Sequence, residues 1–185
     1  MEKKLTRDEL LVSLLKKARN PFTTIEQKND IKRILMESNT MKGMNHLFLA
    51  QCHFEDNPLF QVDEEEAARQ ANLAYRENNT GCFYYLYLLN RDKNEAKARN
   101  YLRLSCTYGN PRAYLEMADL LHSGTLFEKD PDSAFKNYRI AAKCGLEEGY
   151  FGMLLLASES GRYELEKEIY EEAKKKGFTL PGVVK

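Results

Sequence analysis

Apolar residues recur along this chain three or four positions apart, and polar residues fill most of the positions between them. This spacing is typical of amphipathic helices, and no stretch shows the alternation and β-branched enrichment of a strand. The pattern therefore predicts an all-α chain of about ten helices in five antiparallel pairs. We expect the pairs at residues 6–19 with 24–38, 43–56 with 63–78, 80–90 with 93–108, 111–123 with 131–144, and 147–159 with 162–176.

Capping residues mark several of the expected helix ends. The stretch TTIE predicts a start near Thr23, and Asp130-Pro131 combines an N-cap with a proline at the first helical position. Glycines at the expected ends predict a left-handed backbone there: Gly109, Gly145 and Gly177. Three pairs have the spacing of a capping box: Thr6 with Glu9, Asp63 with Glu66, and Asp92 with Glu95.

The second half of the chain repeats part of the first. Residues 57–78 align without gaps with residues 124–145, so that Ala67 lies under Ala134. A different offset places Ala98 under the same Ala134. Internal repetition with a period of this order predicts a helical array, in which each pair buries its apolar face against its neighbours.

The best repeat unit resembles the Sel1-like repeat, a relative of the tetratricopeptide repeat with a slightly longer unit. The family usually has Leu-Gly where this chain has Met117-Ala118, and tyrosine where it has Leu121. The resemblance covers residues 43–177 and rests on these residues: Ala113, Met117, Ala118, Leu121, Gly124, Asp130, Ala134, Tyr138, Ala141, Ala142 and Gly145.

The resemblance implies a single α-solenoid domain over residues 1–185, wound as a right-handed α-α superhelix. Within it, residues 1–40 are an N-terminal helical pair or cap, and residues 178–185 are a C-terminal tail that caps the last pair or hangs free. The repeat units are expected at 43–78, 79–109 (shortened), 110–145 and 146–177.

Charge and composition narrow the range of possible functions. The chain has 28 basic and 28 acidic residues, so its net charge gives no attraction to nucleic acid or to an anionic membrane, and it predicts binding that depends weakly on salt. No apolar run approaches the ~18 residues of a membrane span. The start of the chain has the pattern of a helix and not of a signal peptide, so we expect a cytoplasmic protein with reduced cysteines.

Candidate chemistry is sparse. The stretch QCHFED brings Cys52, His53, Glu55 and Asp56 together, but at helical spacing His53 points away from Cys52 and no third ligand is identifiable. No phosphate-binding loop or hydrolase motif is present. We therefore expect no enzymatic activity, metal or cofactor, and a small metal-binding enzyme at Cys52, His53 and Glu55 is the weakest of three hypotheses.

The resemblance to tetratricopeptide arrays implies a concave face lined by the first helices, where such arrays usually bind. Projecting the side chains of the four first helices predicts two central rows on this face, one entirely apolar and one mostly apolar. Apolar rows bordered by polar or small residues suit the binding of a partner peptide or helix. One row is Phe48, Tyr84, Leu115 and Phe151, and the other is Cys52, Leu88, Asp119 and Leu155. The border is Asn45, Gly81, Arg112 and Glu148 on one side, and Glu55, Arg91, His122 and Ser158 on the other.

Three interpretations of these rows remain open from the sequence. The first is a non-enzymatic adaptor or scaffold whose groove binds a protein partner. The second is a homo-oligomeric structural module, a homodimer for example, whose apolar rows contact a second copy. The third is that the rows are core, or are covered by the chain's own terminus.

Overall fold

The computed structural model describes residues 13–14, 16–17, 20, 22–37, 44–55 and 59–180, without the side chains of residues 35–37 and 44–45. None of the described residues lies in a strand. The predicted helix at 6–19 lies largely outside the described residues, and its Thr6–Glu9 capping box lies entirely outside them. The helices are α2 (Ile25–Glu37), α3 (Met44–Phe54), α4 (Glu64–Arg76), α5 (Cys82–Asn90), α6 (Glu95–Thr107), α7 (Pro111–Ser123), α8 (Pro131–Lys143), α9 (Glu147–Glu159) and α10 (Tyr163–Lys175).

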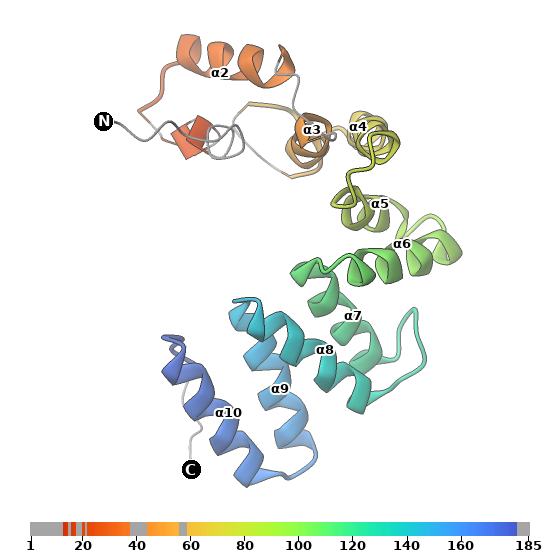
Figure 1. The fold of residues 1–185 in the computed structure, drawn as a ribbon, viewed down its shortest axis with the longest axis vertical. Helices are drawn as coiled ribbons and strands as arrows, with labels where there is room; N and C mark the ends of the chain where they lie inside the picture. The colour runs from red at the N-terminus through yellow and green to blue at the C-terminus, as the bar shows by residue number, and fades with distance from the viewer. Residues whose placement is uncertain are drawn as a thin grey trace. The chain divides into compact units, whose positions relative to one another are not determined.

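Each of these helices falls inside a range that the sequence predicts (Figure 1). The chain forms two compact units, Met1–Tyr101 (the N-terminal unit) and Leu102–Lys185 (the C-terminal unit). The boundary between them falls within α6.

In the N-terminal unit, α3 packs against α2, α4 and α5, and α4 packs against α5. Its core cluster joins Ile31 of α2 to Leu49 and Cys52 of α3, and Phe48 packs against this cluster. The inward face of α4 consists mostly of small residues, since Ala67, Ala71 and Ala74 are fully buried beside the buried Gln70 and let the neighbouring helices approach. Neither α3 (MNHLFLAQCHF) nor α5 (CFYYLYLLN) contains an Asp, Glu, Lys or Arg.

In the C-terminal unit, α8 packs against both α7 and α9, and α10 packs against α9. The approach of α9 to α8 is very close, because a Cβ added to Gly149 would lie 2.5 Å from the backbone nitrogen of Ala142 and 2.6 Å from the carbonyl oxygen of Tyr138. A Cβ added to Gly152 would overlap the ring of Tyr138. The two glycines are therefore what allows Tyr138 to be buried between α7 and α9.

The segment after α10 packs against the last helix pair. Leu180 is buried in the core cluster of the C-terminal unit, and its carbonyl oxygen accepts a hydrogen bond of 3.0 Å from the hydroxyl of Tyr170. The ring of Phe178 lies 5.5 Å from that of Tyr150. Residues 178–180 thus cap the last pair, while residues 181–185 lie outside the described part of the chain.

Most of the predicted caps are confirmed. Asp130 accepts a hydrogen bond from the backbone N–H of Ser133, and Pro131 begins α8. Asp63 likewise accepts from the N–H of Glu66. The three glycines predicted to end helices have left-handed backbones, with φ angles of 79° at Gly109, 93° at Gly145 and 86° at Gly177.

Two caps differ from the sequence prediction. The Asp92–Glu95 capping box is wrong: Asn94 caps α6 by accepting from the N–H of Lys97, because Asp92 lies in the preceding turn and the helix begins at Glu95. At the start of α2, Thr24 and Gln27 form a reciprocal capping box, in which each side chain accepts from the other residue's backbone N–H.

Candidate functional site

The predicted rows lie on α3, α5, α7 and α9, and in the N-terminal unit they are mostly half-buried. On α3, Phe48 packs on the core and Cys52 is 3% exposed within it. Glu55, directly after this helix, accepts a hydrogen bond of 3.1 Å from Gln51. The side chain of Asn45 lies outside the described residues. Cys52 is therefore a core residue in this structure.

The shortened repeat places a cluster of tyrosine rings on α5. Tyr84 and Leu88 are half-buried, and the Tyr84 ring lies 6.1 Å from those of both Tyr85 and Tyr87. The two ends of this helix are marked by Gly81 at its N-cap and by exposed Arg91, whose Nε lies 3.4 Å from a carboxylate oxygen of Asp92.

The C-terminal unit exposes more of its rows. On α7, Leu115 packs against the core, while Arg112 and Asp119 are exposed. On α9, Phe151 is 38% exposed and Leu155 is 51% exposed. Both border residues of α9, Glu148 and Ser158, are also exposed.

A polar network joins α7, α8 and α9, the helices that carry and support these exposed residues. The buried Tyr138 of α8 donates a hydrogen bond of 2.6 Å to a carboxylate oxygen of Asp119 on α7. His122 of α7 meets Glu159 of α9 at 2.9 Å, and its ring lies 6.5 Å from that of Tyr138. Burial raises the pKa of Tyr138 above its usual range, and the hydrogen bond to Asp119 raises it further.

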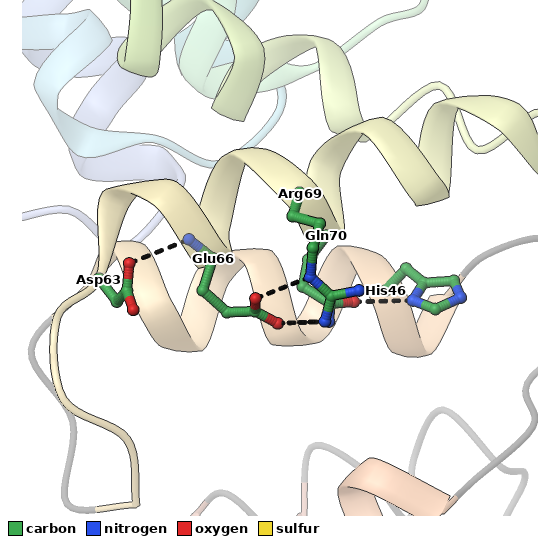
Figure 2. Close-up of polar contacts among 5 residues, drawn as sticks. All are labelled: His46, Asp63, Glu66, Arg69 and Gln70. Atoms are coloured by element: carbon green, nitrogen blue, oxygen red, sulfur yellow. Dashed lines mark hydrogen bonds and ion pairs between the residues drawn. The ribbon is translucent and has the colours of Figure 1, made fainter.

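A second network joins α3 to α4 (Figure 2). Arg69 donates two hydrogen bonds, of 2.7 and 2.6 Å, to the carboxylate of Glu66, which also accepts one of 2.8 Å from the amide of Gln70. The Gln70 amide nitrogen donates to Glu66, and the oxygen of the same amide lies 2.7 Å from Nδ1 of His46. The hydrogen bonds from Arg69 lower the pKa of Glu66 to about 2, against the opposing effect of burial.

Sequence reasoning missed both networks and the two glycines of α9. The contacts from His46 to Gln70 and from His122 to Glu159 join residues 24 and 37 positions apart, so they depend on how helices pack. A local signal did exist for Gly149 and Gly152, because two glycines inside a helix are unfavourable unless close packing requires them.

The residues of the proposed metal site are engaged in packing. Cys52 is buried in the core, and the ring of His53 lies 4.9 Å from that of Phe60. The backbone carbonyl of His53 accepts from the N–H of Asp63, while Asp56 is outside the described residues. Within the ranges that the structure describes, no three His, Cys, Asp or Glu side chains form a group that could hold a metal ion.

Among the described helices, none is long and apolar enough to cross a membrane.

Comparison with known proteins identifies the fold. No protein-family model and no curated protein matches this sequence. Among solved structures, the chain is similar to c5321, a protective antigen present in uropathogenic Escherichia coli strains that displays an SLR fold, with a TM-score of 0.61 and 22% sequence identity. The match covers 84% of this chain and 34% of that one, so the chain spans about a third of the length of c5321.

The chain is thus an all-α helical repeat protein with the Sel1-like repeat fold, as its internal repeats predict. At this level of identity the match shows the fold alone.

Proposed function

We propose that this protein is a non-enzymatic adaptor that binds an extended or helical segment of a partner protein through the first helices of its repeats. The observation that carries this proposal is the exposed face of α9, where Phe151 and Leu155 are 38% and 51% exposed one helical turn apart. If a partner covers the exposed area of these two side chains, each contributes on the order of 1 kcal/mol to the free energy of binding.

The surroundings of this pair support a binding surface. Polar side chains border it, with Glu148 before it and Ser158 and Glu159 after it, an arrangement typical of an apolar contact area with a polar rim. The helices beneath it are held by the Asp119–Tyr138 and His122–Glu159 contacts, so the surface is formed before a partner binds. In the N-terminal unit, Tyr84 and Leu88 of α5 offer a second, half-buried contact area.

Replacing the exposed pair tests the adaptor function. A partner is first isolated from the native host with the intact chain, then purified, and its affinity is measured for the wild type and for the double variant Phe151→Ser/Leu155→Ser. We expect about tenfold weaker binding or more, because central apolar contacts dominate interface energies.

The matched control is Ile140→Ser, since Ile140 is 39% exposed on α8, a second helix. This variant is expected to bind as the wild type does. Unchanged affinity of the double variant, with its helicity intact, would rule out the α9 face as the binding surface. Alanine at Phe48, Tyr84 and Phe151 extends the test along the predicted row that contains Phe151, although Phe48 also supports the core.

The same exposed pair makes self-association the second candidate function. In that case the chain is a structural module, and a second copy covers Phe151 and Leu155. Light scattering separates the two functions, because a dilute monomer excludes the homo-oligomer. A dimer that Phe151→Ser/Leu155→Ser dissociates would favour it.

A further inference from the structure

The first helices of the two units differ sharply in charge. The sequences of α3 and α5 contain no Asp, Glu, Lys or Arg. The sequences of α7 and α9, in contrast, contain one arginine, Arg112, no lysine and five acidic residues: Glu116, Asp119, Glu147, Glu148 and Glu159. The net charge of the whole chain is therefore zero although the two first helices of the C-terminal unit are acidic.

Part of this charge borders the exposed apolar pair. Glu148, Phe151, Leu155 and Glu159 follow one another at intervals of three, four and four residues, so they form one stripe along α9. All four are exposed. The stripe thus presents an apolar centre between two carboxylates, and Asp119 is exposed on α7, the helix that packs beside α9.

The surroundings of these carboxylates compensate only part of their negative charge. Glu159 meets His122 at 2.9 Å, and it lines a cavity of about 200 Å³ together with Lys129 and Arg162. Asp119 accepts from the hydroxyl of Tyr138, a neutral donor that leaves the carboxylate charge in place. Glu148 lies in the first turn of α9, where the helix dipole favours a negative charge.

We propose that the α9 stripe binds a basic amphipathic segment, in which two apolar side chains are flanked by Lys or Arg. This inference rests on the adaptor function proposed above and specifies the chemistry of the partner. Basic flanks would pair with the carboxylates that a neutral or acidic partner would leave without compensation. The same carboxylates would repel the phosphates of nucleic acid or of an anionic membrane.

A salt dependence follows from this assignment. Charged groups at the edge of an interface steer association and are screened by salt. Binding at the stripe should therefore weaken as salt is raised, more than the balanced net charge of the chain predicts.

Selection of random peptides displayed on phage, with the 185-residue chain as the target, tests the proposal. From the wild type we expect sequences with an apolar pair and an excess of Lys and Arg beside it. The variant Glu148→Lys/Glu159→Lys should reverse the preference to Asp and Glu. The control Glu168→Lys/Glu171→Lys changes two exposed glutamates of α10 and should select the same basic sequences as the wild type.

A selected peptide then gives the quantitative readout. Its affinity should fall about tenfold or more in Glu148→Lys/Glu159→Lys and in Phe151→Ser/Leu155→Ser, and it should fall as salt is raised. Peptides that depend on Phe151 and Leu155 but show no charge preference would overturn the basic-segment proposal and leave the adaptor function standing. Selection of no peptide that depends on this pair would overturn both proposals.

Discussion

Glu166 occupies a position at which the other repeats bury an alanine. Aligning the second helices places it level with Ala67, Ala98 and Ala134, each of which is 0% exposed. Glu166 is itself only 6% exposed, and its carboxylate oxygen Oε1 has no hydrogen-bond partner in the structure. A buried acceptor without a partner destabilises the folded state relative to the unfolded chain, in which water solvates it.

Replacing Glu166 with alanine should therefore stabilise the protein. We expect Glu166→Ala to raise the free energy of unfolding by about 1 kcal/mol, since the gain from removing the unpaired oxygen exceeds the loss of side-chain packing. Urea denaturation measures the change, and Glu168→Ala, at an exposed position of the same helix, is the control. A loss of stability in Glu166→Ala would show that its carboxylate has a structural role.

Glu66 gives a prediction about pH. Its pKa of about 2 in the folded state lies below the ordinary value of 4.5, because Arg69 stabilises the ionised carboxylate. The unfolded chain then takes up the proton first as pH falls, so the stability that Glu66 contributes is complete above pH 4.5 and is lost as the pH falls towards 2.

As the pH is lowered from 4.5 towards 2, the free energy of unfolding should decline less steeply in Glu66→Gln than in the wild type. Glu65→Gln, on the adjacent exposed residue, should retain the wild-type slope. Equal slopes in the wild type and Glu66→Gln would mean that the Arg69 contact does not persist in solution.

At the scale of elements, the contact between α8 and α9 has almost no room for adjustment. Gly149 faces backbone atoms of α8, which cannot rotate away as a side chain can. Gly81 is different, because a Cβ added there would meet a terminal methyl carbon of Leu47 at 2.7 Å, and that side chain is flexible.

Gly149→Ala should therefore destabilise the fold by about 1–3 kcal/mol, although alanine is the better helix former by about 1 kcal/mol. Thermal unfolding monitored by circular dichroism gives the comparison with Gly81→Ala, which should differ little from the wild type. Hydrogen exchange should show the loss of protection mainly in α7–α10, because repeats are stabilised by their immediate neighbours. A Gly149→Ala variant as stable as the wild type would contradict the close approach.

Local patterns in the sequence were sufficient to predict the helices but not the exposure of the rows. Helix bounds and the caps at Asp63 and Asp130 depend on residues within one turn, so their spacing is informative. Phe48 and Phe151 share a repeat position, yet Phe48 packs against a core cluster that includes Ile31 of α2, whereas Phe151 stays 38% exposed. The cluster beside Phe48 thus includes a residue from a helix that does not show the repeat pattern, and the repeat alignment could not predict it.

Across the whole molecule, the four cysteines differ in accessibility. Cys52 and Cys82 are buried, Cys106 is partly buried, and Cys144 is exposed. Burial raises the pKa of Cys82 to about 11 and that of Cys106 to about 12, which keeps both thiols protonated at neutral pH.

Alkylation of the native protein should consequently modify Cys144 quickly and the other three slowly. Mass spectrometry after brief treatment with iodoacetamide at neutral pH should find a single adduct, at Cys144, and four after denaturation. Cys144→Ser should leave the native protein unmodified over the same period. Rapid modification of Cys82 would show that α5 opens in the native state.

The absence of charge from α3 and α5 has a consequence for the chain before it folds. The stretch CFYYLYLLN combines aromatic and aliphatic residues with no charge and no proline, the composition of segments that self-associate as β-structure when exposed. In the folded protein five of its nine residues are buried. Variants that open the N-terminal unit would therefore be lost from solution through aggregation, whereas the acidic first helices of the C-terminal unit carry charges that oppose it.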